Sequence, residues 1–193
     1  MAGHTRYTAL LDACVLFPIA VADALMSLAT AGLFAAKWTA QIEEEWIKSL
    51  EDWRPELKGK LEDRRRLMRE AVPDWEVPPV GWQALVACIN LPDPNDHHVL
   101  AAAIAGHADC IVTSNLKDFP AAVVQPFGIE ILHPDEFIIK QWDLDELAAV
   151  AAFKRMRARR KNPEATAEDF AQAMERNGLA ATAERLRDAA ELI

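Results

Sequence analysis

Long apolar runs are missing from this sequence. A membrane-spanning helix needs about 20 consecutive apolar residues, and every apolar run here is far shorter. At the N-terminus, Asp12 falls inside what would be the apolar core of a signal peptide, which argues against a secretory leader. We therefore expect a soluble, cytoplasmic protein that makes no use of a membrane.

Cysteine and positive charge are also in short supply. Cys14, Cys88 and Cys110 are odd in number, form no CxxC pair and lie in apolar runs, which predicts reduced core residues rather than disulfides or a zinc site. With 21 basic and 30 acidic residues, the formal net charge is -9. This balance argues against a surface that coats nucleic acid nonspecifically, although it leaves room for a local basic groove or for carboxylates gathered around a metal.

The apolar pattern alternates between short strand-like runs and helical stretches. Strands are predicted in TALL, DCIVTS and IEIL, and helices in AVADALMSLATAGL, AQIEEEWIKSLEDW, GKLEDRRRLMREAV, HHVLAAAIAGHA and HPDEFIIKQW. Thr39 is placed to cap the second of these helices, Pro73 to end the third, and Pro134 to lie in the first turn of the last. GWQALVACINL fits either a buried strand or a short helix. This alternation predicts an α/β fold with a parallel sheet flanked by helices.

The chain changes character beyond about Trp142. The remaining sequence has no strand-like run, and the breaks NPEATAEDF and RNGL divide it into about three helices. We expect a main domain over residues 1–142 and a helical C-terminal extension over residues 143–193.

Polar residues follow the predicted strands at the points where the strands end. Asp12 comes directly after one apolar run, and Asn115 and Asp118 come after another. Asp96 is placed to cap the helix that starts at His97. The carboxyl ends of parallel strands open onto one crevice, where several carboxylates would repel one another unless a cation shared them. Oxygen ligands without cysteine favour Mg²⁺ or Mn²⁺.

Four blocks, LLDACVLFP, TAQIEEEW, DPNDHHVLAAA and CIVTSNLKDFP, in this order and spacing, resemble the PIN-domain family of metal-dependent ribonucleases, and most of all its VapC-type toxins from bacterial toxin–antitoxin pairs. The resemblance covers roughly residues 7–139, and the tail resembles the C-terminal extension of one subgroup. It implies a three-layer α/β/α sandwich, an acidic quartet that binds Mg²⁺ or Mn²⁺, endonucleolytic cleavage of RNA and a cognate antitoxin.

The resemblance places the family's acidic residues on particular positions of this chain. The catalytic set becomes Asp12, Glu45, Asp96 and Asp118, and the metal ligands become Asp12, Asp96, Asn115 and Asp118. Glu44 competes with Glu45, and by default at least two of Glu43, Glu44 and Glu45 form a solvated helix face. Asn115 stands where many family members have an aspartate, so the fourth position is divided between Asn115 and Asp118.

Three further residues are expected to support this site. Thr113 and Ser114 either orient the attacking water through their hydroxyls or simply end a strand, and Asp93 forms a turn or orients a ligand. Asp12 and Asp96 each have a simpler alternative role as helix caps. His97 and His98 are not expected to share an ion, because adjacent helical residues point about 100° apart. We expect His98 to pack or to contact a phosphate, and His97 to be solvated.

Positive charge for RNA is densest in FKRMRARRKN. This run predicts RNA or partner contact through Arg155, Arg157, Arg159 and Arg160, whereas DRRRLMR, at residues 63–69, is predicted to be a solvated face.

The function indicated is a metal-dependent endoribonuclease, the toxin of a toxin–antitoxin pair, with a homodimer left open. The alternative is an inactive PIN-like module that binds RNA or a protein without cleavage. Asn115 supports this alternative because it lacks the charge of the aspartate that many family members have there. A phosphate-transfer domain would need paired aspartates near the first strand, and a Ser-His-Asp hydrolase would need a GxSxG motif; the sequence has neither.

Overall fold

The computed structural model describes residues 6–161 and 164–193, and its centre is a four-stranded parallel sheet. The strands are β1 (Thr8–Leu11), β2 (Ala35–Lys37), β3 (Cys110–Val112) and β4 (Glu130–Leu132), in the spatial order β2-β1-β3-β4. In the central pair, Ala9 is opposite Cys110 and Leu11 is opposite Val112. β3 is buried along its whole length. The three strands predicted from apolar runs are confirmed.

Edge strand β2 was not predicted. It is only three residues long, and Ala-Ala-Lys carries no β-branched or aromatic residue that would mark a strand. Its pairing with β1 defines it. The chain then continues through Trp38, whose amide donates to the carbonyl of Trp75 and whose carbonyl accepts from Val77, both at 2.9 Å. These bonds protect part of the sheet edge.

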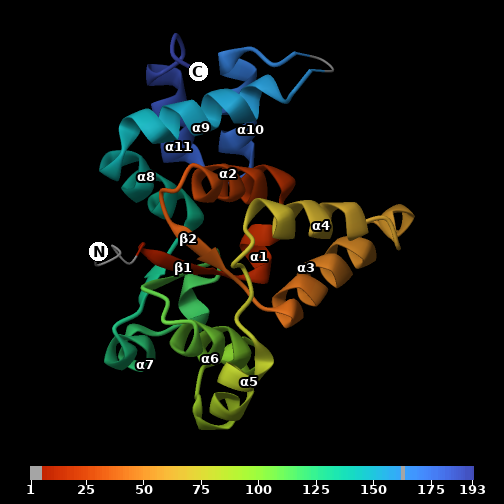
Figure 1. Ribbon diagram of the computed structural model, residues 1–193, viewed down its shortest axis with the longest axis vertical. Helices are drawn as coiled ribbons and strands as arrows, with labels where there is room; N and C mark the ends of the chain where they lie inside the picture. The colour runs from red at the N-terminus through yellow and green to blue at the C-terminus, as the bar shows by residue number, and fades with distance from the viewer. Residues whose placement is uncertain (1–5, 162–163) are drawn as a thin grey trace.

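Helices cover both faces of the sheet, as Figure 1 shows. On one face lie α2 (Ile19–Thr30), which contacts β2, and α8 (Pro134–Leu144), which packs on α2. On the other lie α6 (His97–Ala105), in contact with β1 and β3, and α7 (Ala121–Val124), in contact with β4. The result is the expected three-layer α/β/α sandwich. No helix within the described ranges is long and apolar enough to cross a membrane.

A helical hairpin of α3 (Ala40–Trp53) and α4 (Glu62–Ala71) stands beside the sandwich, joined by a 3-10 turn (Pro55–Leu57). Thr39 caps α3 as predicted, accepting from the amide of Ile42 at 3.1 Å. The solvated face expected for residues 63–69 is wrong for three arginines, of which Arg65 is 25% exposed and lies 4.0 Å from Oε2 of Glu43. The guanidinium carbon of Arg64 lies 4.5 Å from the Trp46 ring centroid. Arg64 also donates to the carbonyls of Leu16 and Phe17, and burial lowers its pKa to about 10. Arg69 is paired with Glu43.

The segment that fitted either a strand or a short helix is helical. It forms α5 (Pro79–Trp82) and a 3-10 helix (Gln83–Cys88), followed by a 3-10 turn (Pro94–Asp96). Cys88 is exposed, so the expectation that it lies in the core is wrong: the 3-10 helix that carries it buries none of its residues. Cys110 is buried, Cys14 is half-buried, and all three thiols are free, as predicted.

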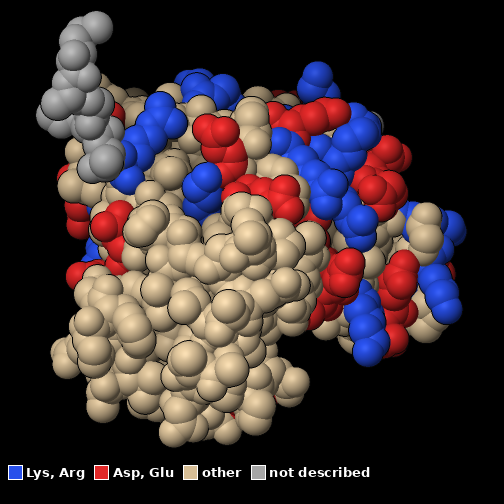
Figure 2. All heavy atoms as spheres, turned by 60° about the horizontal axis from the view of Figure 1, so that its bottom comes forward, with Lys and Arg blue, Asp and Glu red and all other residues tan. Residues whose placement is uncertain are grey.

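The face that carries α5, α6 and α7 is almost free of charge (Figure 2). Residues 77–92, 97–108 and 119–129 contain no Lys, Arg, Asp or Glu. The charged side chains drawn in Figure 2 gather on the rest of the surface. Lysine and arginine side chains that would bind a polyanion therefore lie outside this face.

Within residues 145–161 and 164–193 the chain forms three helices, as predicted: α9 (Glu146–Ala158), α10 (Ala167–Arg176) and α11 (Ala180–Asp188). α9 packs on α2 and α11 packs on α8. Asp135, on α8, accepts from the amides of Ala181 and Thr182, both at 2.8 Å, and so caps α11 from another helix. The boundary expected between residues 142 and 143 falls inside α8.

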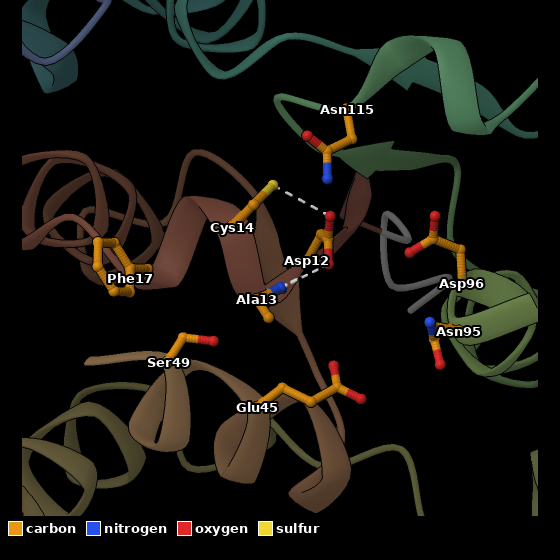
Figure 3. A pocket seen from close by; sticks show the side chains of 9 residues that line it. All are labelled: Asp12, Ala13, Cys14, Phe17, Glu45, Ser49, Asn95, Asp96 and Asn115. Atoms are coloured by element: carbon orange, nitrogen blue, oxygen red, sulfur yellow. Dashed lines mark hydrogen bonds between the residues drawn. The ribbon is translucent and has the colours of Figure 1, made fainter. Parts of the chain in front are cut away.

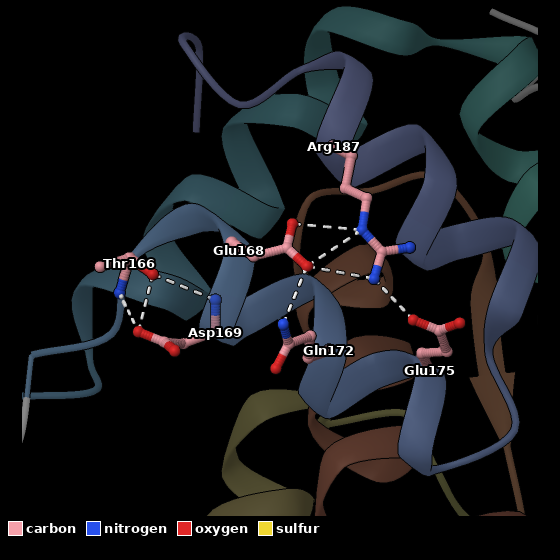
Figure 4. Close-up of polar contacts among 6 residues, drawn as sticks. All are labelled: Thr166, Glu168, Asp169, Gln172, Glu175 and Arg187. Atoms are coloured by element: carbon pink, nitrogen blue, oxygen red, sulfur yellow. Dashed lines mark hydrogen bonds and ion pairs between the residues drawn. The ribbon is translucent and has the colours of Figure 1, made fainter.

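Hydrogen bonds and ion pairs also stabilise the C-terminal extension internally (Figure 4). Thr166 and Asp169 form a capping box at the start of α10, which lowers the pKa of Asp169. Arg187 of α11 pairs with Glu168 and Glu175 of α10. The break predicted at NPEATAEDF begins with residues 162 and 163, which lie outside the described residues.

Candidate metal-dependent nuclease site

The carboxyl ends of β1 and β3 open onto a pocket of about 400 Å³ (Figure 3). Its lining combines acidic, amide and small polar side chains from four separate segments: Asp12, Ala13, Cys14, Phe17, Glu45, Ser49, Asn95, Asp96 and Asn115. Four of these are residues that the sequence assigned to the site, namely Asp12, Glu45, Asp96 and Asn115. No lysine or arginine is among the described residues that line the pocket.

Asp12 is 95% buried and has a well-defined hydrogen-bond environment. It caps α1 (Ala13–Leu16) through Oδ1, which accepts from the amide of Ala13 at 2.6 Å. Its Oδ2 accepts from the Thr113 hydroxyl at 2.7 Å and from the Cys14 thiol at 3.0 Å. The capping role therefore coexists with a place in the pocket, because a carboxylate has about four lone-pair positions. The Thr113 hydroxyl donates a hydrogen bond to Asp12 and so fixes the orientation of this carboxylate.

Cys14 bridges the two strand ends at the pocket. Burial, with the charge of Asp12 next, raises the pKa of its thiol to about 12, so the thiol keeps its proton at neutral pH. Its sulfur also accepts from the amide of Ser114 at 3.2 Å. The side chain of Ser114 is exposed and does not line the pocket.

Asp96 is the N-cap residue of α6, as its position predicted, but its side chain makes no capping bond, so the alternative that this carboxylate serves only as a cap is wrong. Asp93 is the residue that stabilises the turn, accepting from the amide of Asn95 at 2.9 Å. Burial raises the pKa of Asp96 to about 6, with further contributions from the charges of Asp12, Asp93 and Asp118. Asp118 therefore acts electrostatically on Asp96, although it does not itself line the pocket.

The three consecutive glutamates have three different environments. Glu45 lines the pocket, whereas Glu44 is exposed and does not. Glu43 is buried, accepts from the indole of Trp38 at 3.0 Å and pairs with Arg69 at 2.5 Å. The expectation that at least two of the three lie on a solvated face is therefore wrong. The helical period of about 100° per residue turns these neighbours toward the pocket, solvent and the core.

The two histidines also have separate partners, as the helix geometry predicted. His98 is buried, and its Nε2 lies 2.9 Å from Oε1 of Glu45. His97 accepts from the amide of Leu91 through Nε2 at 3.1 Å, so the expectation that it is solvated is wrong.

The chemistry of this pocket fits a hard divalent cation. Asp12, Glu45, Asp96 and Asn115 offer oxygen donors only, which is the ligand type that Mg²⁺ and Mn²⁺ prefer. Burial, followed by the charges of Asp12, Asp93 and Asp118, raises the pKa of Asp96, and a bound cation would offset both effects. Within residues 6–161 and 164–193, no three His, Cys, Asp or Glu side chains already form a cluster able to hold an ion. The donors converge on the pocket without a preassembled coordination shell.

The arginines of the C-terminal run make intramolecular contacts. Arg157 donates to the carbonyl of Ile193 at 2.7 Å, and Arg159 pairs with Asp23 at 2.5 Å. Arg160 lies 4.9 Å from the ring centroid of Phe170, and Arg155 is exposed. None of these arginines lines the acidic pocket.

Five residues line the pocket but were not assigned to it from the sequence: Ala13, Cys14, Phe17, Ser49 and Asn95. Each had a usable signal. The first three belong to α1 or end it, directly after Asp12. Ser49 lies one helical turn after Glu45, and Asn95 immediately precedes Asp96.

Comparison with known families agrees with this architecture. The PIN domain matches residues 8–117, which is more than half of the chain, and the chain therefore belongs to the PIN-domain family. A second family, the VapC50 C-terminal domain, matches residues 134–188 and so takes in α8 together with the three tail helices. The family indicated by the four sequence blocks is confirmed.

A curated relative extends the comparison. Over 76 residues the chain is 45% identical to a protein described as putative ribonuclease VapC50, from Mycobacterium tuberculosis (strain ATCC 25618 / H37Rv). The alignment covers 39% of this chain and 44% of the relative, so the chain matches less than half of that protein's length. No solved structure gives a significant match.

Proposed function

We propose that this protein is a metal-dependent endoribonuclease that acts as the toxin of a toxin–antitoxin pair in the cytoplasm. The observation that carries the proposal is the convergence of Asp12, Glu45 and Asp96 on one pocket, where the pKa of Asp96 is raised to about 6. Membership of the PIN-domain family and the similarity to a putative ribonuclease support the reaction type.

The protein's own residues would have distinct tasks in this reaction. Asp12, Asp96 and Asn115 would hold the cation, Mg²⁺ or Mn²⁺, with Asp118 adding negative charge nearby. When bound, such a cation lowers the pKa of a water molecule and offsets the charge of the phosphate. Thr113 and Cys14 hold the Asp12 carboxylate through hydrogen bonds of 2.7 and 3.0 Å. Glu45 faces the same pocket from α3 and would orient the attacking water or accept its proton.

The test is RNA cleavage by the purified chain with and without Mn²⁺. Asp12→Asn and Asp96→Asn should each remove cleavage while the circular dichroism spectrum stays native, and chelation by EDTA should have the same effect. Glu44→Gln is the matched control, because this glutamate is exposed and outside the pocket. Full cleavage by the Asp12→Asn, Asp96→Asn double variant would contradict the proposal.

A second candidate function is a PIN-like module that binds RNA or a protein without cutting it. The specific observation in its favour is Asn115, which gives the pocket an amide where the family commonly has a carboxylate. Binding of RNA without cleavage in Mn²⁺ would support this candidate. Asn115→Asp should then strengthen Mn²⁺ binding and, if a charge is all that is missing, produce cleavage.

The biological part of the proposal concerns a cognate antitoxin and a homodimer. Expression of the chain alone should arrest growth, and co-expression of the antitoxin should relieve the arrest. Light scattering on the purified chain measures whether it dimerises. Normal growth at high expression, with an intact pocket, would contradict the toxin assignment.

A further inference from the structure

One face of α3 leads from the acidic pocket to an exposed tryptophan. Glu45, Ser49 and Trp53 follow each other at intervals of four residues and so lie on the same side of the helix. Glu45 and Ser49 line the pocket. Trp53, at the end of the helix, is 68% exposed, which is unusual for so large an apolar side chain. At 1.5 Å per residue, it lies about 12 Å from Glu45 along the helix axis.

The tryptophan is joined to the pocket by a second aromatic ring. Phe17 lines the pocket, and its ring centroid lies 5.8 Å from that of Trp53, with the two planes at 55°. The rings therefore form an aromatic rim that is continuous with the acidic site. Arg54 lies beside it, with its guanidinium carbon 5.8 Å from the Trp53 ring centroid.

The charges around the pocket limit how RNA could bind there. The described residues that line it include three carboxylates and no lysine or arginine, so a phosphate gains no direct ion pair from the pocket wall. Stacking of a base on an aromatic ring needs no positive charge, and it is worth enough to change affinity by about 5- to 150-fold per base. Among the described residues, Arg54 forms an ion pair with exposed Glu56 at 2.8 Å, and such a surface pair is readily exchanged for a phosphate.

We propose that Trp53 and Phe17 form a base-stacking subsite that holds one nucleobase of single-stranded RNA beside the acidic pocket. This inference rests on the proposed function and adds to it two side chains, outside the acidic set, that contact the substrate. A paired base is already stacked inside its duplex, whereas an unpaired base can turn onto a protein ring. The subsite therefore favours an unpaired segment over a duplex, with little dependence on which base is held.

Binding is measured in the Asp12→Asn background with Mg²⁺ present, using a labelled single-stranded oligoribonucleotide and fluorescence anisotropy. Trp53→Ala should weaken binding by about 10-fold, whereas Trp53→Phe, which keeps a ring, should stay within about 3-fold of the parent. The slope of affinity against salt should not change with Trp53→Ala, because no ion pair is lost. Val80→Ala is the control: this residue, in α5, is 90% exposed and should have no effect.

An abasic scan of the same oligonucleotide gives the sharper test. At one position, removing the base should lower the affinity of the parent to that of Trp53→Ala, and should leave the affinity of Trp53→Ala unchanged. Equal binding by Trp53→Ala and the parent would overturn the subsite, as would an abasic penalty of the same size in both proteins. Native thermal melting of Trp53→Ala checks that the fold is kept.

Cleavage by the chain with its native Asp12 separates this inference from the proposed function. Cleavage without any effect of Trp53 overturns the subsite alone, and a Trp53-dependent affinity without cleavage overturns the nuclease alone. If RNA neither binds nor is cleaved, the subsite and the nuclease function are both wrong. If Trp53→Ala binds RNA normally but escapes inhibition by a protein partner, the aromatic rim is a protein contact and the inference is wrong.

Discussion

The Nε2 atom of His98, on α6, lies 2.9 Å from Oε1 of Glu45, on α3, and so joins two helices that flank the acidic pocket. His98 is buried beside Trp82, at 6.1 Å between ring centroids, and its Nδ1 has no hydrogen-bond partner among the described residues. Its polar contact is thus directed to Glu45. The pair holds a carboxylate of the helical hairpin toward the sandwich.

We expect His98→Leu to reduce Mn²⁺-dependent cleavage by about 10-fold, the lower end of what the loss of a supporting hydrogen bond costs at a metal site. His98→Gln keeps an N–H donor and should recover most of the activity. In a Glu45→Ala background, His98→Leu should cause little further loss, because its effect acts through Glu45. Initial cleavage rates of the parent, the three single variants and the double variant measure this. Equal losses in both backgrounds would show that His98 acts independently of Glu45.

Asp96 should make stability depend on pH in the absence of metal. Its pKa is raised from 3.8 to about 6 in the folded protein, so the ionised form is disfavoured by folding. Below about pH 4 the Asp96 carboxyl is protonated in both the folded and the unfolded state and costs no stability. As pH rises from about 4 through 6, the free energy of unfolding falls. Asp96→Asn removes this penalty and should raise the free energy of unfolding by about 1–2 kcal/mol at pH 8, after allowance for solvent screening.

Urea unfolding of both proteins in EDTA, from pH 4 to pH 8, measures this difference. The gain from Asp96→Asn should shrink toward zero at pH 4. A difference that is the same at both ends of the range would show that the carboxylate is not strained by its surroundings.

The strands and helices that carry the site could be predicted because their signals are local. Buried strands β1 and β3 are runs of apolar residues, and Thr39 marks the start of α3 by a capping rule. Asp12, Asp96 and Asn115 were located because each follows such an element or begins one. β2 was missed because its three residues become a strand only through their pairing with β1.

The roles of individual charged residues were harder to predict, since they depend on partners distant in the sequence. Nothing in the sequence near Glu43 indicates that its buried carboxylate will pair with Arg69, 26 residues later. Arg159 similarly finds Asp23, 136 residues away. The division of the chain after residue 142 and the roles of all the site residues, including every ligand of the cation, stay predictions.

Glu43→Gln should destabilise the protein strongly, although it lies only two residues from the pocket-lining Glu45. Its carboxylate is buried and accepts hydrogen bonds from Arg69, which is 40% exposed, and from Trp38. Because solvent screens the arginine that is left behind, we expect a loss of about 2 kcal/mol in the free energy of unfolding. Glu44→Gln, at an exposed position, should change it by less than about 0.5 kcal/mol. Urea unfolding of both variants decides this, and equal stability would place Glu43 in solvent.

The arginines of the C-terminal run should separate into structural and ligand-binding groups. Arg159 donates to Asp23 at 2.5 Å and to Ser27 at 2.9 Å, which ties the end of α9 to α2. Arg159→Gln should therefore lower the thermal melting temperature slightly, because exposed ion pairs contribute about 1 kcal/mol or less. It should leave the salt dependence of RNA binding unchanged, since this guanidinium is held by two partners on α2, whereas Arg54 has the single exposed partner Glu56.

Arg155→Gln is the clean test of RNA contact by the tail, because Arg155 is exposed. If its guanidinium binds a phosphate of single-stranded RNA, the variant should bind all sequences more weakly, and the slope of log affinity against log salt should fall by about 0.7. Melting temperature should stay at the parent value. If RNA binding is unaffected but inhibition by the antitoxin is lost, the run is a partner contact. If both stay at parent levels, α9 presents only a solvated basic face and its predicted ligand role is wrong.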